Sequence, residues 1–245
     1  MNSALDIENL SVSYGKKIAL ENISLSIPAG QITGIIGPNG SGKSTLIKSA
    51  MNLIPANSGN VRMLGSELDK VRKRVSYVPQ RESVDWDYPV SVFDVILMGR
   101  YRPGRLFLPL SAEDRKIAEE SLERVQLTEY RNTQIGQLSG GQQQRVFIGR
   151  ALAQRAELYL MDEPFAGVDA ATEKAILDLM FDMKSQGQSI VLIHHDLVSV
   201  RDNFDHLVIL KNKLIASGPT SEVFTTKNLI ASYGGSMRIM QELDV

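Results

Sequence analysis

The chain has 245 residues, and hydrophobic side chains make up 43% of them, which is enough for one domain with a sizeable core. Its 27 lysines and arginines nearly balance its 28 aspartates and glutamates, so the net charge of −1 excludes the basic surface expected of a nucleic-acid-binding protein. The sequence has no cysteine, which excludes thiol chemistry. It also has no apolar run of 18 residues and begins with acidic residues, so it predicts neither a membrane-spanning helix nor a signal peptide.

The first half of the chain predicts strands followed by helices. Between residues 4 and 30, apolar residues alternate on either side of a break at Gly15-Lys16, which predicts an antiparallel hairpin. The apolar run Ile32–Ile36 predicts a buried strand. Between about 91 and 153 the apolar spacing is helical, and Ser111–Asp114 resembles a capping box.

The second half of the chain returns to strands. Apolar runs at Leu158–Met161, Ile190–Ile193 and Leu207–Leu210 predict three of them, and a helix is predicted near Thr172–Gln186. Strand, helix and strand in this order favour a parallel sheet. The tail from Thr220 predicts short helices.

Residues 37–44, which we call the phosphate loop, fit the pattern G-x-x-x-x-G-K-[ST] between a strand and a helix. Backbone N–H groups and a helix N-terminus bind polyphosphate only where no Cβ holds the chain away, as at Gly40 and Gly42. Lys43 is expected to contact the β- and γ-phosphates, and Ser44 to ligate Mg²⁺. An ordinary glycine turn is the alternative. The expected nucleotide contacts are Gly37, Pro38, Asn39, Gly40, Ser41, Gly42, Lys43, Ser44 and Thr45.

A second glycine motif, Leu138-Ser139-Gly140-Gly141-Gln142, resembles the signature sequence of ATP-binding cassette (ABC) proteins. Ser139 and the amides of Gly140 and Gly141 would open a helix and present donors and a positive dipole end to phosphate. In that family this end faces the γ-phosphate bound by the other subunit. The resemblance therefore implies a homodimer in which Ser139, Gly140, Gly141 and Gln142 contact the partner's nucleotide.

Two adjacent carboxylates, Asp162 and Glu163, follow the apolar run 158–161. Adjacent side chains of an extended segment point to opposite sides, so the two carboxylates can take separate tasks. The resemblance implies that Asp162 holds Mg²⁺ through water and that Glu163 orients and deprotonates the attacking water. The alternative is a pair of solvated acids at a strand end.

Four single residues also match the ABC pattern. Gln80 resembles the glutamine that senses Mg²⁺ and the γ-phosphate, and His195 resembles the switch histidine that contacts the γ-phosphate. The following aspartate sets the register in favour of His195 over His194, and a metal site at the adjacent histidines is disfavoured because neighbours face opposite ways. Asp169 matches the loop aspartate that crosses between subunits. Tyr14 is expected to stack on adenine, with a purely structural tyrosine as the alternative.

The resemblance covers residues 4–220 and implies an α/β fold. It implies a P-loop NTPase (RecA-like) core with an antiparallel β subdomain, a helical subdomain inserted over about 91–153, and a short helical tail over 221–245. The homodimer would close around ATP and Mg²⁺ and reopen after hydrolysis.

Three classes of ABC ATPase are candidates. The stretch between Ser44 and Leu138 is too short for the long coiled arms of chromosome or repair ATPases, and the chain has one cassette where translation factors have two. We therefore expect a transport motor, peripheral on the cytoplasmic face of the cell membrane, whose membrane spans lie on a separate permease. The alternatives are an importer subunit for another solute and a non-transport ABC ATPase acting on DNA or ribosomes.

Two segments, 84–101 and 163–173, resemble the manganese/zinc/iron group of ABC importers. This resemblance implies uptake of manganese, zinc or iron, an extracytoplasmic metal-binding receptor as an indirect partner, and no nucleic acid. Because the permease of the family inserts a coupling helix just after the position of Gln80, exposed Trp86 and Tyr88 are expected to anchor it. A core position for Trp86 is the alternative.

Overall fold

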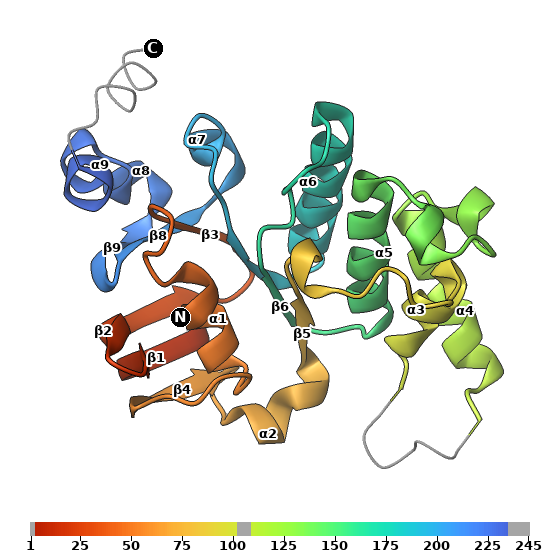
Figure 1. Ribbon diagram of the computed structural model, residues 1–245, viewed down its shortest axis with the longest axis horizontal. Coiled ribbons are helices and arrows are strands. Elements are labelled where there is room, and N and C mark those ends of the chain that lie inside the picture. Colours follow the sequence, from red (N-terminus) through yellow and green to blue (C-terminus); the bar gives the residue numbers. More distant parts are fainter. Residues whose placement is uncertain (1–2, 102–108, 235–245) are drawn as a thin grey trace.

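The computed structural model describes residues 3–101 and 109–234, which form two sheets surrounded by helices (Figure 1). Residues 235–245 of the predicted tail lie outside the described residues. None of the helices in the described part of the chain is long and apolar enough to cross a membrane.

The smaller sheet is antiparallel and has the strand order β2-β1-β4. Its strands are β1 (Ser3–Tyr14), β2 (Lys17–Pro28) and β4 (Ser58–Met63). The β1–β2 hairpin turns at Gly15, whose φ of 59° is left-handed and suits glycine. This is the antiparallel subdomain expected from the alternating apolar residues.

The larger sheet has the strand order β5-β6-β7-β3-β8-β9, and every neighbouring pair is parallel except β8 with β9. The predicted parallel sheet is therefore confirmed. Its strands are β3 (Ile32–Ile36), β5 (Val75–Val78), β6 (Leu158–Met161), β7 (Ser189–Ile193), β8 (His206–Lys211) and β9 (Lys213–Pro219).

The central strands separate two hydrophobic cores, because alternate side chains of a strand face opposite ways. Ile190 and Leu192 of β7 belong to the core shared with the helices between residues 92 and 185, whereas Val191 and Ile193 belong to the core beneath the antiparallel sheet and α1 (Lys43–Ala50). Both faces of the sheet are thus buried, which explains why its strands are continuous apolar runs.

A group of helices lies to one side of the parallel sheet (Figure 1). It consists of α3 (Val92–Met98), α4 (Ala112–Arg124) and α5 (Gly140–Ala153), which pack against one another. Ser111 forms the capping box with Asp114 that its sequence indicated. The Arg100 side chain joins the helices, because it donates to Asp114 at 3.0 Å and to the Ala153 carbonyl at 2.8 Å.

The remaining elements connect the strands or follow them. The longest is α6 (Ala170–Ser185) between β6 and β7. The others are α2 (Leu68–Val71), η1 (Arg72–Arg74), η2 (Arg81–Ser83), η3 (Thr128–Tyr130), η4 (Ile135–Gln137), α7 (Val200–Asn203), α8 (Thr220–Val223) and α9 (Thr226–Tyr233).

Candidate active site

The phosphate loop leaves β3 and enters α1 at Gly42. The Lys43 ammonium is folded back onto the loop, where it donates to the carbonyls of Gly37 at 2.8 Å and Pro38 at 3.1 Å. Burial lowers the pKa of Lys43, while the carboxylates of Glu163 and Asp162 act in the opposite direction. The loop therefore holds one cation at its centre, with two acids close by.

The loop glycines are also required by their neighbours in the fold. At Gly37 a Cβ would lie 2.2 Å from the carbonyl oxygen of Leu210, and at Gly42 it would lie 2.5 Å from the Leu20 side chain. By contrast, a Cβ at Gly40 would meet nothing within 4 Å. The sequence suggested that Gly40 and Gly42 allow the close approach of a phosphate. At Gly42, tight packing against Leu20 of β2 is a second reason for glycine.

Asp162 lies at the bottom of the site, fully buried after β6. Its Oδ1 accepts from the Ser44 hydroxyl at 2.8 Å, and the Lys48 ammonium is 3.9 Å from Oδ2. Oδ2 accepts no hydrogen bond of good geometry from any described residue, although the Tyr77 hydroxyl, whose pKa is raised by burial and by the Asp162 carboxylate, lies beside the same group. Burial raises the pKa of Asp162, while the Ser44 hydrogen bond lowers it. A buried carboxylate oxygen with no well-placed donor, beside a serine hydroxyl, is a set of oxygen ligands that suits a small divalent cation.

The next residue, Glu163, turns away from Asp162. The two were expected to separate by strand alternation, but β6 ends at Met161 and Glu163 has a left-handed φ of 53°. A left-handed turn therefore separates the carboxylates. Such a conformation is uncommon outside glycine, and the turn that follows is closed by a hydrogen bond of 3.1 Å from the Ala166 N–H to the Glu163 carbonyl. The Glu163 side chain makes contacts of its own.

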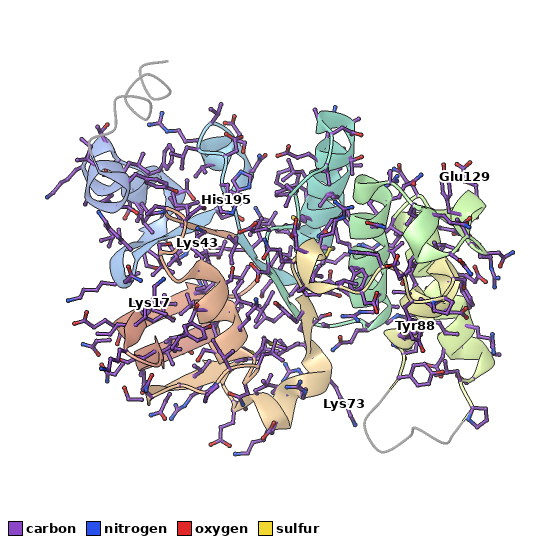
Figure 2. The ribbon with its side chains drawn as sticks, in the orientation of Figure 1. Lys17, Lys43, Lys73, Tyr88, Glu129 and His195 are labelled. Atoms are coloured by element: carbon purple, nitrogen blue, oxygen red, sulfur yellow. The ribbon has the colours of Figure 1, made fainter. Side chains whose placement is uncertain are left out.

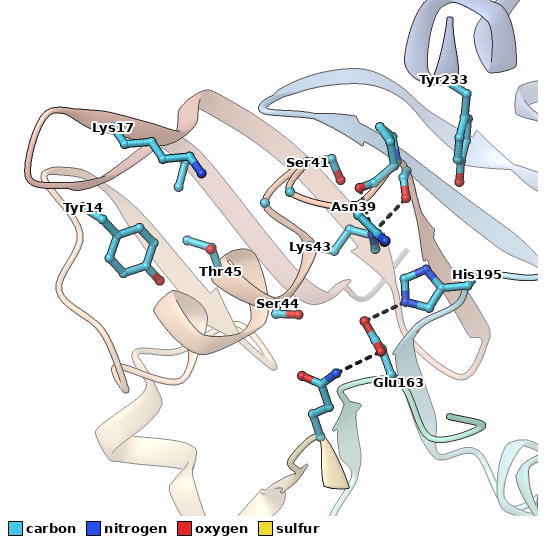
Figure 3. Close-up of a pocket in the computed structure, with 16 residues that line it drawn as sticks. Tyr14, Lys17, Asn39, Ser41, Lys43, Ser44, Thr45, Glu163, His195 and Tyr233 are labelled. Atoms are coloured by element: carbon cyan, nitrogen blue, oxygen red, sulfur yellow. Dashed lines mark hydrogen bonds and ion pairs between the residues drawn. The ribbon is translucent and has the colours of Figure 1, made fainter. Parts of the chain in front are cut away.

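Those contacts bring together three predicted residues from three adjacent strand ends (Figure 3). The Oε1 atom of Glu163, after β6, lies 2.6 Å from Nε2 of His195, after β7. Its Oε2 atom accepts a hydrogen bond of 3.1 Å from the Gln80 amide, after β5. Because β5, β6 and β7 are neighbouring parallel strands, their carboxyl ends deliver all three side chains to one place.

The two adjacent histidines have different environments. His194 is buried between Phe165 and Phe204, with ring centroids 5.4 and 5.1 Å away, and its Nε2 lies 2.8 Å from the Ser199 hydroxyl. Burial lowers the pKa of His194 to about 4, so its ring is neutral near pH 7. His195 points into the site, as the sequence register indicated.

The phosphate loop, Gln80, Glu163 and His195 line a pocket of about 970 Å³, a volume typical of small-molecule sites, whereas Asp162 and His194 do not line it. Tyr14 and His195 lie on different walls of it (Figure 3). Among the predicted residues, the lining includes Tyr14, Gly37, Pro38, Asn39, Gly40, Ser41, Gly42, Lys43, Ser44, Thr45, Gln80, Glu163 and His195.

Three lining residues were not predicted: Lys17, Ala19 and Tyr233. Lys17 pairs with Tyr14 across the β1–β2 hairpin, so the hairpin register could have indicated it. Tyr233 ends α9, far from every motif, and no sequence signal pointed to it.

The signature residues and Asp169 do not line this pocket. Ser139 is exposed and caps α5 through a capping box with Gln142, whose side chain accepts from the Ser139 N–H at 2.8 Å. Asp169 is exposed and caps α6 by accepting from the Thr172 N–H at 2.8 Å. Two capped helix N-termini therefore face outward from the chain.

Trp86 does not have the exposed position that was expected of it. It packs edge-on against Phe147 of α5, with ring centroids 5.2 Å apart, and its Nε1 donates to the Arg81 carbonyl at 3.0 Å. Trp86 is therefore partly buried at the edge of the core, which is neither the exposed anchor that was expected nor a fully buried core position. Tyr88 is 61% exposed beside the α3–α5 group (Figure 2).

Comparison with known proteins shows the family to which the chain is similar. The family model described as "ABC transporter" matches residues 20–166. The manganese transport system ATP-binding protein MntB of Bacillus subtilis is 50% identical, over 97% of this chain and 95% of that protein. The zinc transport system ATP-binding protein TroB of Treponema pallidum is 47% identical, over 95% of this chain and 87% of that protein.

Solved structures are similar over the whole fold. An ATP-binding cassette of an ABC transporter in its ADP conformation matches with a TM-score of 0.80 and 29% identity, over 96% of this chain and all of that one. The CbiO1 protein of Clostridium perfringens, part of an ABC transporter complex, matches with a TM-score of 0.79 and 26% identity over the full length of both chains.

The loop glycines yield a stability prediction. Gly40→Ala adds a methyl group in open space at a φ of 77°, and should cost about 1–2 kcal/mol of unfolding free energy through left-handed strain. Gly42→Ala has a φ of 97° and also contacts Leu20, so it should cost roughly 1–3 kcal/mol more. Urea denaturation measures both values, and equal losses would contradict the packing role of Gly42.

Proposed function

Because the chain belongs to the ABC transporter family, we propose that it is the ATP-hydrolysing subunit of a system that takes up manganese or zinc through a separate membrane permease. The observation that carries the proposal is the Glu163 carboxylate, held between His195 and Gln80 beside the phosphate loop. The metal is inferred from the relatives named above, and it is the cargo of the system.

Nucleotide binding follows from the phosphate loop. Successive backbone N–H groups and the N-terminus of α1 face the pocket, and Lys43 adds a full positive charge. Tyr14 offers its ring, 52% exposed, at the side of the pocket where an adenine can stack.

A magnesium ion fits beside the loop. The Ser44 hydroxyl and the Asp162 carboxylate, with its Oδ2 lacking a well-placed donor, would hold the ion, and Gln80 lines the same pocket. When bound, Mg²⁺ supplies positive charge that neutralises the phosphates. Asp162 has to be ionised for this task, and the nearby Lys48 and Lys43 ammonium groups favour its charged form.

Glu163 has the position of a general base. Its carboxylate lines the pocket, and the side chain is only 18% exposed. His195 and Gln80 each hold one oxygen, which fixes the direction of the carboxylate toward the pocket. A water molecule between this carboxylate and the terminal phosphate would lose its proton to Glu163 as it attacks.

The two outward-facing caps are proposed to complete the site of a second chain. The first turn of a helix leaves N–H groups without an intrahelical acceptor, so Gly140 and Gly141 of α5 can donate to phosphate. Since Ser139 and Asp169 are exposed and lie outside the pocket of their own chain, a head-to-tail homodimer would use them.

A groove between the core and the α3–α5 group is the proposed contact for the permease. It has a volume of about 680 Å³ and combines exposed Leu53, Met98 and Tyr101 with basic side chains. The exposed basic residues are Arg72, Lys73 and Arg155, whereas Arg150 is half-buried and Arg100 is buried and paired with Asp114. Such a surface suits an amphipathic permease segment that carries acidic residues. The subunit would then lie on the cytoplasmic face of the membrane, with a metal-binding receptor on the other side.

The hydrolytic role of Glu163 is tested by Glu163→Gln, which keeps the shape of the side chain and removes the base. Hydrolysis should fall about a hundredfold or more, while ATP binding remains and an ATP-bound dimer accumulates on gel filtration. Glu157→Gln, at the other end of the β6 region and paired with Arg74, is the matched control and should hydrolyse ATP normally. Normal turnover by Glu163→Gln would exclude Glu163 as the base.

The cargo and the docking groove are tested together by uptake of radioactive manganese or zinc in cells that lack this chain. The wild-type chain should restore uptake. Lys73→Glu places a negative charge on the exposed basic edge of the groove (Lys73 is labelled in Figure 2), so it should restore severalfold less uptake while still binding ATP.

The matched control is Lys116→Glu, the same charge change on the exposed surface of α4, which should restore uptake fully. Lys73→Glu cells with wild-type uptake would reject the groove. Cells that lack the chain but keep normal metal uptake, and lose transport of an organic solute, would reject the metal and leave the ATPase assignment standing.

A further inference from the structure

The C-terminal helix α9 places an aromatic residue on the pocket wall. Tyr233 is its last residue, and its ring lines the pocket on a different side from Tyr14 (Figure 3). The helix is fixed to β8, because the Ser232 hydroxyl donates to the Leu210 carbonyl at 3.2 Å and Lys211 donates to the Ala231 carbonyl at 3.3 Å. Since a Cβ at Gly37 would touch Leu210, α9 is seated directly behind the start of the phosphate loop.

The hydroxyl group of Tyr233 is buried, and no described residue accepts a hydrogen bond from it. Burial raises its pKa to about 12, while the backbone N–H of Gly37, which points to the phenolic oxygen, lowers it, and this places the hydroxyl beside the loop. The group therefore keeps its proton at neutral pH and is available as a donor. A buried donor without an acceptor is unfavourable, so an acceptor brought by a ligand would be stabilised.

The residues at the two ends of the pocket indicate which group of a bound nucleotide would be that acceptor. Tyr14 marks one end, where an adenine can stack, and the Glu163–His195 pair marks the end where the terminal phosphate is attacked. Figure 3 places Tyr233 on the side of Asn39 and His195, away from Tyr14. A nucleotide bound in this direction would turn its terminal phosphate oxygens toward the Tyr233 hydroxyl.

We propose that the Tyr233 hydroxyl donates a hydrogen bond to the terminal phosphate of ATP and so helps the subunit to distinguish ATP from ADP. The proposal rests on the nucleotide site assigned above. It also connects α9 to the occupancy of the pocket, because the residue that senses the phosphate belongs to the same helix that packs on β8. The ring of Tyr233 would remain in place when ADP is bound, but its hydroxyl would again lack an acceptor.

The test compares affinities for ADP and for a non-hydrolysable imido analogue of ATP, measured by calorimetry with the full-length chain and Mg²⁺. Tyr233→Phe removes only the hydroxyl and keeps the ring. Because a hydrogen bond to a charged group is lost, affinity for the ATP analogue should fall about tenfold or more, with affinity for ADP unchanged.

Tyr159→Phe is the matched control, since Tyr159 also has a buried hydroxyl without a partner among the described residues but lies in β6 outside the pocket. It should leave both affinities unchanged. If Tyr233→Phe leaves both unchanged, or weakens both equally, Tyr233 does not sense the terminal phosphate. If the wild-type chain binds neither nucleotide, the proposed function itself fails.

Discussion

The parallel alignment of four neighbouring strands is the constraint on which the site depends. In the order β5-β6-β7-β3, all four carboxyl ends lie at the same edge of the sheet. Gln80, Glu163, His195 and the phosphate loop follow these ends, although more than a hundred residues separate the first and last of them along the chain. Ligand sites of open parallel sheets generally form at this edge. The hydrogen-bonded register of these strands sets the distances between these groups.

The same arrangement of strand ends also connects the pocket to α5. Gln80 contacts Glu163, and the next residue, Arg81, donates from Nε to the buried Gln143 of α5 at 2.9 Å. Gln143 in turn donates to the Ile135 carbonyl at 3.1 Å. The segment after β5 therefore touches the pocket and the signature helix at once. A change at Glu163 when nucleotide binds has a short, contiguous route to the part of the chain that is proposed to meet the partner.

Local motifs allowed most of the fold and much of the site to be predicted from sequence. The parallel sheet, the hairpin, the capping box at Ser111 and the α/β class were all predicted correctly, because each depends on short-range patterns of apolar, glycine and capping residues. Features created by distant contacts could not be predicted. Trp86 packs against Phe147 of α5, and Tyr233 reaches the pocket because α9 packs on β8. The left-handed φ of Glu163 was not predicted either, because strand alternation was expected at this position.

In the proposed homodimer, one working site needs the phosphate loop of one chain and the signature motif, residues 138–142, of the other. Lys43→Ala damages the first and Ser139→Arg the second, so a mixed dimer of the two variants carries both defects in one site and leaves the other intact. Gel filtration and ATP hydrolysis of an equal mixture test this directly. We expect each variant alone to be inactive. In the presence of ATP, the mixture should form dimers and regain part of the ATP hydrolysis. Full ATP hydrolysis by Ser139→Arg alone, or a mixture that neither forms dimers nor hydrolyses ATP, would contradict a site shared between two chains.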